Sequence, residues 1–318
     1  MKIICLSEQP HRAHDVYGDE ICVMSKADVL NAPADFADTE YIFSTWGMPN
    51  FTEREIAALF PSLKAIFYAA GSVQYFAKPF LNSGVKVFSA WAANAVPVAE
   101  YTVAQIVLAN KGFFRTMRYT DRDRAKATTA AYGGNYGVKI GILGAGMIGK
   151  LVIRMLKSYA MEILVFDPFL SDEAAAELGV TKGSLETVFR ECHVVSNHLA
   201  DNEQTKGMLD KPLFESMRPN AAFLNTGRGA QVVEDDLIAV LKARNDLVAI
   251  LDVTDPEPPL AGSELYALDN CILTPHIAGS IGNEVKRMAQ YMYEEHERFV
   301  NGEPCRWEVT LEMLKTMA

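Results

Sequence analysis

Short apolar or β-branched runs alternate with segments of helical periodicity along most of the chain. Because parallel strands need helical crossovers, this alternation predicts parallel sheets covered by helices on both faces. In the first third, the expected strands are 2–6, 41–45, 63–69 and 85–89. A second series predicts a doubly wound sheet of about six strands. Its expected strands are 138–143, 162–166, 193–197, 221–225, 247–252 and 272–274.

The segments between strands carry helix signals of different strength. Thr52-x-x-Glu55 predicts a capping box at the start of a helix. Residues 95–111 have apolar positions at three-to-four spacing, which predicts a long amphipathic helix. A last helix, with an apolar face from Ile281 to Tyr293, is expected to pack on the first domain. Residues 120–135 show little periodicity, so we expect a solvated loop or arm there.

Length and composition indicate a soluble protein of two domains. A chain of 318 residues exceeds what one core usually organises, and 49% hydrophobic with 22% charged residues is ordinary for globular proteins. No apolar run approaches a membrane span, and the opening MKIICLSEQP resembles a strand more than a signal peptide. We therefore expect a cytoplasmic protein without membrane contact.

Charge and cysteine usage exclude further classes. A net charge of −10 gives no general attraction to phosphate backbones, so nucleic acid is not expected as a partner. The five cysteines are scattered and contain no C-x-x-C pair. This spacing argues against a disulfide framework and a zinc cluster, and we expect no metal.

The strongest motif is a glycine-rich loop. The expected strand at 138–143 runs directly into G-A-G-M-I-G, and a helical pattern follows. This is G-x-G-x-x-G in the strand–turn–helix context that dinucleotide binding requires. The first glycine permits the turn, the second lets the backbone approach a pyrophosphate, and the third allows close helix packing. The residues expected to face the phosphates are Gly144, Gly146, Met147, Ile148 and Gly149.

Asp167 ends the next expected strand, where the fingerprint places a carboxylate on the adenosine ribose hydroxyls. A 2'-phosphate would meet a like charge there, and no Arg or Lys follows in Pro168-Phe169-Leu170. The sequence therefore favours NAD over NADP. An ordinary acidic residue at a strand end is the alternative.

Three later strand ends carry Arg228, Glu257 and His276. Because the carboxyl ends of parallel strands share one edge, we expect these side chains to meet. A guanidinium matches a carboxylate and a carbonyl oxygen, and an imidazole can give or take a proton. Glu257 beside His276 would favour the imidazolium and fix its tautomer. Taken singly, each residue has an ordinary structural explanation. Arg228 could form a surface ion pair, Glu257 could be a solvated loop residue, and His276 could be a buried histidine.

Five stretches together resemble the D-isomer-specific 2-hydroxyacid dehydrogenase family across essentially the whole chain. They are Asn94–Glu100, the glycine loop, Asn225–Gly229, Leu251–Val253 with Asp255–Pro258, and Thr274–His276. The resemblance implies an α/β fold of two doubly wound parallel-sheet domains. A Rossmann NAD domain, residues 96–279, is then inserted in a flavodoxin-like substrate domain, residues 1–95 and 280–318. It also implies an NAD-dependent oxidoreductase that interconverts a small 2-keto acid and a D-2-hydroxy acid by hydride transfer, and a homodimer formed through the cofactor domain.

The same resemblance implies residue roles. Arg228 would hold the substrate carboxylate and carbonyl, and His276, paired with Glu257, would be the general acid or base. Asp252 would bind the nicotinamide carboxamide. Other cofactor positions are Val98, His198, Thr226, Gly227 and Gly279, and the substrate positions in the first domain are Trp46, Gly71, Ser72 and Val73. Two departures stand out: Val73-Gln74-Tyr75-Phe76 replaces the family's usual substrate loop, and the proline that follows His198 in the family is missing.

Other readings stay open at this point. A dinucleotide-sensing interaction module or corepressor can use the same fold. Oxidation of formate is disfavoured, because the formate enzymes carry glutamine where Glu257 stands. Trp46, Tyr68, Tyr75 and Phe76 suggest an aromatic-walled pocket for a compact or apolar side chain, with simple core packing as the alternative.

Overall fold

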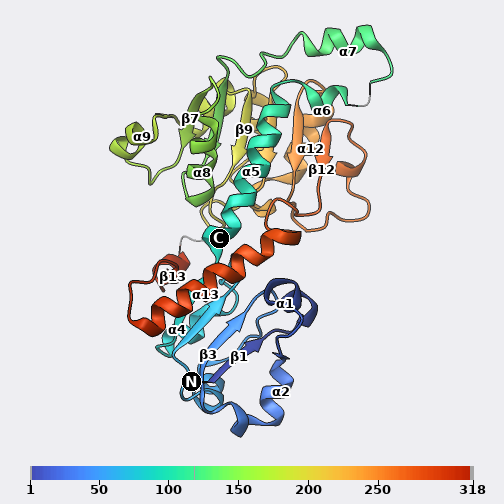
Figure 1. Cartoon of the computed structure of the whole chain (residues 1–318). Helices are drawn as coiled ribbons and strands as arrows, with labels where there is room; N and C mark the ends of the chain where they lie inside the picture. Colours follow the sequence, from blue (N-terminus) through green and yellow to red (C-terminus); the bar gives the residue numbers. More distant parts are fainter. Residues whose placement is uncertain (1, 118, 316–318) are drawn as a thin grey trace. The chain divides into compact units, whose positions relative to one another are not determined.

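The computed structural model describes residues 2–117 and 119–315. The chain divides into two compact units, the first formed by residues 1–95 with 280–318 and the second by residues 96–279. Each unit contains one sheet with helices on both faces (Figure 1). The predicted α/β class with two parallel-sheet domains is confirmed.

The sheet of the first unit has the strand order β13-β5-β4-β3-β1-β2. Its strands are β1 (Lys2–Leu6), β2 (Val23–Met24), β3 (Thr39–Ser44), β4 (Ala65–Tyr68), β5 (Lys86–Ser89) and β13 (Glu308–Val309). The first five are parallel in the flavodoxin-like order, and β13 pairs antiparallel with β5 at the edge. The helices are α1 (Pro10–Tyr17), α2 (Lys26–Asn31), α3 (Glu53–Leu59), α4 (Ala77–Asn82) and α13 (Val285–Asn301), with short 3-10 turns at Pro33–Phe36, Gly282–Glu284 and Met313–Lys315.

Both faces of this first sheet are buried, so its strands are continuous apolar runs. Ile42 faces a core shared with α3 and α4, and its neighbour Phe43 faces a second core shared with α1 and α13. Helix α13 contributes Met288 and Met292 to that second core, which confirms that the last helix packs on this unit. The helix begins only at Val285, so Ile281 is not on its apolar face and is 55% exposed.

The sheet of the second unit is fully parallel, with the order β12-β11-β10-β9-β6-β7-β8. This is the Rossmann order extended by one strand. The strands are β6 (Lys139–Leu143), β7 (Glu162–Phe166), β8 (Thr181–Lys182), β9 (Val194–Asn197), β10 (Ala222–Asn225), β11 (Val248–Leu251) and β12 (Cys271–Leu273). The expected count of six omitted β8, a two-residue edge strand. The helices are α5 (Trp91–Ala109), α6 (Phe113–Thr116), α7 (Arg122–Thr129), α8 (Met147–Leu156), α9 (Asp172–Leu178), α10 (Leu185–Glu191), α11 (Lys211–Ser216) and α12 (Glu234–Ala243), with 3-10 turns at Gly229–Gln231 and Glu264–Tyr266.

Helix α5 is 19 residues long, contains Pro97, and includes the division between the units. By length and composition it is the one helix in the described part of the chain that matches a membrane span, although half of its apolar window is buried. The expectation that no apolar run reaches that length was therefore wrong. Ala99, Ile106 and Ala109 place the helix in the core of the second unit, and core helices meet the same criterion.

The segment predicted as a loop or arm contains a helix, α7. Asp121 caps it by accepting a hydrogen bond from the Arg124 N–H at 2.9 Å. None of its residues is buried, and it extends away from the sheet of the second unit (Figure 1). The segment is solvent-exposed as expected, and only its helix was not predicted. A helix without an apolar face leaves no periodic signal in the sequence.

Candidate active site

Three neighbouring strands of the second unit, β10, β11 and β12, end at the loops that carry the predicted catalytic residues. Gly229 in the first loop packs so closely on the next that a Cβ there would lie 2.0 Å from the carbonyl carbon of Thr254. Only glycine therefore lets the Arg228 loop contact the loop that leads to Glu257.

His276 and Glu257 form a direct pair. Nδ1 of His276 lies 2.6 Å from Oε1 of Glu257, and the two side chains are 49% and 42% exposed. A carboxylate at this distance accepts a hydrogen bond from the Nδ1–H and leaves Nε2 as the free nitrogen of the ring. His276 has a left-handed backbone, with φ +54°. This conformation is uncommon outside glycine and needs support from surrounding contacts.

Asp252 provides that support. Its main-chain carbonyl accepts the His276 N–H at 3.0 Å. Its carboxylate accepts the Ile277 N–H at 2.9 Å on Oδ1 and the Ala278 N–H at 2.8 Å on Oδ2. The Thr274 hydroxyl donates to Oδ1 at 2.6 Å. Asp252 is only 2% exposed, so these four hydrogen bonds fix the loop that carries His276.

Arg228 lies at the same strand edge, half-buried. Its Nη1 donates to the Gly227 carbonyl at 2.9 Å, and the Asn225 side-chain amide donates to the Arg228 carbonyl at 3.1 Å. Within residues 2–117 and 119–315, no carboxylate forms an ion pair with Arg228, and no hydrogen bond joins it to Glu257 or His276. A guanidinium without a carboxylate partner among the described residues is available for an anionic ligand.

The glycine loop has the geometry that a pyrophosphate requires. Gly144 has φ +88°, and a Cβ there would lie 2.6 Å from the His198 carbonyl oxygen. A Cβ on Gly149 would lie 2.0 Å from the Gly144 carbonyl oxygen, so the helix packs directly on the turn. At Gly146, by contrast, a Cβ would meet nothing within 4 Å. Gly146 caps α8 without a side-chain bond, so the first-turn N–H groups, including those of Met147 and Ile148, lie beside open space.

Asp167 follows β7 next to this loop. Its Oδ2 accepts the Ala145 N–H at 2.6 Å, and its Oδ1 accepts the Phe169 N–H at 2.7 Å. Each carboxylate oxygen keeps a second lone pair for a ribose hydroxyl. The carboxylate also orders the glycine loop, a contact that the fingerprint alone did not predict.

His198 and Thr226 lie together, buried, beneath the same edge. Ser196 Oγ is 2.9 Å from His198 Nε2, and Thr226 Oγ1 is 3.5 Å from Nδ1. Burial lowers the pKa of His198 to about 3, so its ring is neutral. Val98 is buried as well, and Gly227 is buried while Gly279 is partly exposed. These contacts give His198 and Thr226 a structural role that requires no ligand.

The predicted substrate residues Trp46, Gly71, Ser72 and Val73 belong to the first unit. Ser89 Oγ lies 2.9 Å from the Ala70 carbonyl oxygen and 2.6 Å from that of Gly71, so its single proton is shared between the two carbonyls and holds the loop that follows β4. Val73 is buried, whereas Gly71, Ser72 and Trp46 are partly exposed. Tyr68 and Phe76 are core residues, 2% and 1% exposed, so core packing accounts for two of the four aromatic residues noted in the sequence.

Sequence reasoning missed several residues that position this site. Tyr101 on α5 reaches Thr274 Oγ1 at 2.9 Å, and Thr102 reaches Thr226 Oγ1 at 3.2 Å. Gln231 bridges the loops after β9 and β10, because its Nε2 donates to the Leu199 carbonyl and its Oε1 accepts from Asn197. No sequence motif marks these contacts, since each joins residues from separate elements.

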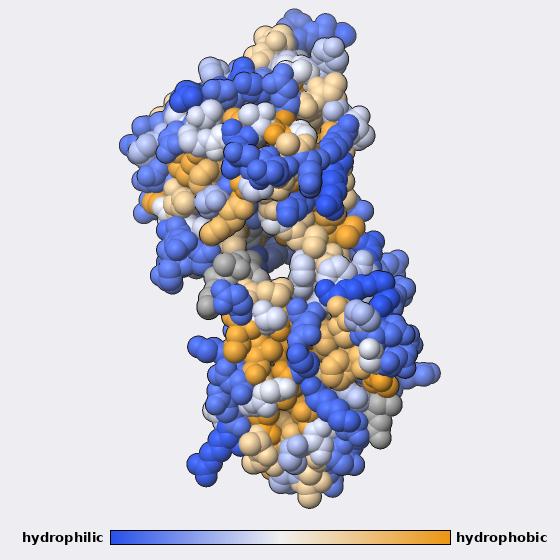
Figure 2. Space-filling view, turned by 90° about the vertical axis from the view of Figure 1, so that its left-hand side faces the viewer, coloured by the Kyte–Doolittle hydropathy of each residue, from blue (hydrophilic) through white to orange (hydrophobic). Residues whose placement is uncertain are grey.

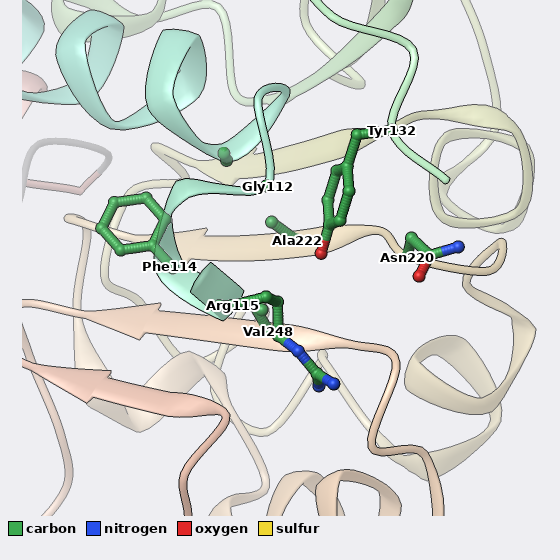
Figure 3. Close-up of a pocket in the computed structure, with 8 residues that line it drawn as sticks. Gly112, Phe114, Arg115, Tyr132, Asn220, Ala222 and Val248 are labelled. Atoms are coloured by element: carbon green, nitrogen blue, oxygen red, sulfur yellow. The ribbon is translucent and has the colours of Figure 1, made fainter. Parts of the chain in front are cut away.

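Two surface pockets of the second unit lie at the opposite edge of its sheet. In the pocket of Figure 3, the Tyr132 ring stands over the start of β10 and β11, next to Ala222 and Val248. A Cβ on Gly112 would lie 2.7 Å from that ring, so Tyr132 anchors the end of the α7 segment. A second depression, with Lys139, His193 and Arg218 in its wall, lies at the amino ends of β6 and β9. Neither pocket contains a residue of the candidate site.

Comparison with known proteins places this geometry in a family. The model described as "D-isomer specific 2-hydroxyacid dehydrogenase, NAD binding domain" matches residues 103–278. The chain is 29% identical over 228 residues to D-3-phosphoglycerate dehydrogenase of Archaeoglobus fulgidus, covering 72% of this chain and 43% of that protein. It is 33% identical over 205 residues to a putative 2-hydroxyacid dehydrogenase of Bacillus subtilis, covering 62% and 58%. The chain thus spans about half the length of these curated relatives.

Among solved structures, the NAD-complexed form of a D-isomer specific 2-hydroxyacid dehydrogenase from Lactobacillus delbrueckii ssp. bulgaricus shares the fold. The TM-score is 0.78 at 18% identity, covering 98% of this chain and 100% of that one. The open space at Gly146, the helix N-terminus and Asp167 fit the cofactor named by the matching family. NAD is therefore the cofactor, and the chain belongs to the D-isomer specific 2-hydroxyacid dehydrogenase family.

Proposed function

We propose that this protein interconverts a small 2-keto acid and the corresponding D-2-hydroxy acid with NAD. The observation that carries the proposal is the His276–Glu257 pair, with Nδ1 and Oε1 2.6 Å apart at the strand edge that also carries Arg228 and the glycine loop. An imidazole with a carboxylate on one nitrogen and a free second nitrogen is the arrangement of a general acid or base.

The reaction assigns each residue a separate task. Arg228 binds the substrate carboxylate and carbonyl oxygen, for which its planar fork and permanent charge are suited. Bound NADH supplies the hydride to the carbonyl carbon. His276 gives its Nε2 proton to the developing alkoxide during reduction and takes it from the hydroxyl during oxidation. Glu257 accepts the Nδ1 hydrogen bond and stabilises the imidazolium before the proton is given.

The same pair argues against an interaction module without turnover. Glu257 and His276 are both substantially exposed, and neither supports the core of the second unit. A protein that only senses the dinucleotide has no need of them, since the cofactor loop, Asp167 and the helix N-terminus suffice for binding.

A panel of 2-keto acids, followed by the loss of NADH absorbance, tests the proposal. We expect turnover of at least one 2-keto acid and formation of the D-isomer, identified by chiral chromatography of the product. An interaction module would bind NADH, as seen by fluorescence titration, without oxidising it in the presence of any keto acid. That second outcome would overturn the proposed function while leaving the cofactor assignment intact.

The proposal includes a homodimer formed through the second unit, as the family resemblance implies. Helix α7 contributes no residue to the core of its own chain. The segment around it exposes apolar side chains: Phe113 is 42%, Met117 40%, Tyr119 65% and Tyr136 84% exposed. In Figure 2, hydrophobic residues also gather in broad areas on the face of one unit, where a strip of hydrophilic residues divides them. A projecting helix flanked by exposed apolar residues is suited to packing against a second copy.

A further inference from the structure

The strand order of the first unit reverses next to β1, and the roles proposed above include no charged residue at this reversal. In the order β2-β1-β3-β4-β5, strand β1 lies between β2 and β3. The chain therefore adds β2 on one side of β1 and then crosses to add β3 on its other side. Ligands of open α/β sheets bind beyond the carboxyl ends of the strands at such a reversal. The two loops that border this point follow β1 and β3.

These two loops are fastened to each other. The Ser7 hydroxyl donates to the Trp46 carbonyl at 2.8 Å, and the Glu8 N–H donates to the Gly47 carbonyl at 2.7 Å. Gly47 has φ +86°, and a Cβ there would lie 2.9 Å from Ser7 Oγ and 3.0 Å from the Gln9 backbone nitrogen. The two loops therefore form a rigid rim above the carboxyl ends of β1 and β3, and Trp46 is held in place by its backbone.

A cation lies on this rim. Arg12, in the first turns of α1, has its guanidinium carbon 5.3 Å from the centroid of the Trp46 ring. The indole orients the guanidinium through a cation–π contact without neutralising its charge. The side chain is exposed, and among the described residues no carboxylate lies within ion-pair distance of it. An oriented guanidinium without an acidic partner is the recognition group for a carboxylate, phosphate or sulfonate.

We propose that Arg12 binds a second acidic group of the substrate, so that the physiological 2-keto acid carries two negative groups. This inference rests on the proposed function, together with the substrate positions Gly71–Val73 that the family resemblance implies in the loop after β4. Strand β4 is two positions from β1 in the sheet, a separation of roughly 10 Å. A keto diacid of three to five carbons, together with a long arginine side chain, spans that separation. The aromatic residues alone had suggested a compact or apolar substrate.

The test compares keto acids of both classes. Pyruvate, 2-oxobutanoate and glyoxylate have no second acidic group, whereas oxaloacetate, 2-oxoglutarate, 3-phosphohydroxypyruvate and sulfopyruvate offer a carboxylate, a phosphate or a sulfonate. We expect kcat/KM of the wild-type protein to be at least about tenfold higher for one or more dianionic substrates, as one charge-assisted hydrogen bond allows. The dianionic substrate with the highest kcat/KM then shows whether Arg12 binds a carboxylate, a phosphate or a sulfonate.

The variant Arg12→Gln keeps a polar side chain with N–H donors, but it shortens the side chain and removes its charge. We expect kcat/KM for the preferred dianion to fall by about 10- to 100-fold, chiefly through KM, with the monoanions changed by less than about threefold. Arg54→Gln, which removes an exposed arginine from α3 of the same unit, is the matched control and should leave both classes unchanged. Inhibition by malonate or succinate, which cannot be reduced, should weaken in Arg12→Gln by a similar factor.

The outcomes separate the two proposals. If monoanions and dianions are reduced equally well, or if Arg12→Gln affects both classes alike, the function stands and the role of Arg12 is refuted. If no keto acid of either class is reduced, the proposed function itself fails, and the substrate class derived from it fails with it.

Discussion

The Thr274 hydroxyl lies 2.6 Å from Oδ1 of Asp252 and donates a hydrogen bond to it. Because that hydroxyl has a single proton, the Tyr101 hydroxyl, 2.9 Å away, must donate to Thr274 rather than accept from it. Hydrogen bonds therefore run from Tyr101 to Thr274 and from Thr274 to the buried Asp252 carboxylate, which also accepts from the backbone of Ile277 and Ala278. Asp252 holds the left-handed loop at His276, and its contribution to activity should pass through that residue.

Asp252→Ala should lower kcat/KM by about 10²- to 10³-fold, because the His276 loop loses three hydrogen bonds to a charged group. If Asp252 acts through His276, the double variant with His276→Ala should be no slower than His276→Ala alone. Steady-state kinetics of the four proteins measure this coupling. Additive losses would show that Asp252 acts independently, for example through the cofactor.

His276→Ala should lose most of its turnover, by about 10²- to 10⁴-fold in kcat, because no other group replaces the proton donor. The affinity for NADH should stay within about threefold, since the ring forms no contact with the glycine loop or with Asp167. NADH fluorescence titration and single-turnover kinetics measure the two quantities separately. A matched loss of cofactor affinity would contradict the assigned role.

Asp167→Ala should show the opposite pattern, with NADH affinity lowered by about 10- to 100-fold. The variant removes the ribose acceptor and also the hydrogen bonds that order Ala145 and Phe169. Asp167→Asn is the control, since it keeps the shape but loses the charge that opposes a 2'-phosphate. For Asp167→Asn, the ratio of the affinity for NADH to the affinity for NADPH should decrease. An unchanged ratio would show that Asp167 does not select between the two cofactors.

The neutral, buried His198 makes stability depend on pH. Its pKa is lowered to about 3 in the folded protein, from an ordinary value near 6.5, because burial disfavours the charged ring. Between these two values the unfolded chain binds a proton that the folded chain does not, so stability falls as the pH decreases below about 6.5.

Inside that pH window His198 should cost about 1.4 kcal/mol of unfolding free energy per pH unit. His198→Gln cannot be protonated at this position. Its unfolding free energy, measured with denaturant, should therefore fall less between pH 6.5 and pH 5 than that of the wild-type protein. His193 and His296, whose pKa values burial also lowers, contribute equally to both proteins and cancel in the comparison. Parallel pH profiles for the two proteins would exclude a protonation-linked role for His198.

Replacement of the exposed apolar residues beside α7 should weaken the proposed dimer. Tyr119→Asp combined with Tyr136→Asp places charges at side chains that are 65% and 84% exposed, and should shift the mass in light scattering from a dimer toward the 35.1 kDa monomer. Tyr159→Asp, at a 38% exposed position after α8, should leave the mass unchanged. A wild-type protein that is monomeric at micromolar concentration would refute the dimer.

Features set by neighbours in the chain were predictable from the sequence. The capping box at α3 forms as expected, with Thr52 Oγ1 accepting from the Glu55 N–H and Glu55 Oε2 accepting from the Thr52 N–H, because both partners lie within one turn. The glycine loop was equally predictable, since its strand, turn and helix follow one another directly in the sequence. Short or unburied elements were not: β2, β8 and β13 have two residues each, and α7 has no apolar face.

The amino-acid sequence by itself determined the alternation of strands and helices, the cofactor fingerprint and the residue types that the proposed reaction needs. All of these depend on local spacing and side-chain chemistry. Only the tertiary structure decided that Asp252 binds the backbone 25 and 26 positions later, and that Arg12 lies on Trp46, 34 positions away. Such contacts follow from strand order and packing, which bring together groups whose separation along the chain carries no information about their distance in space.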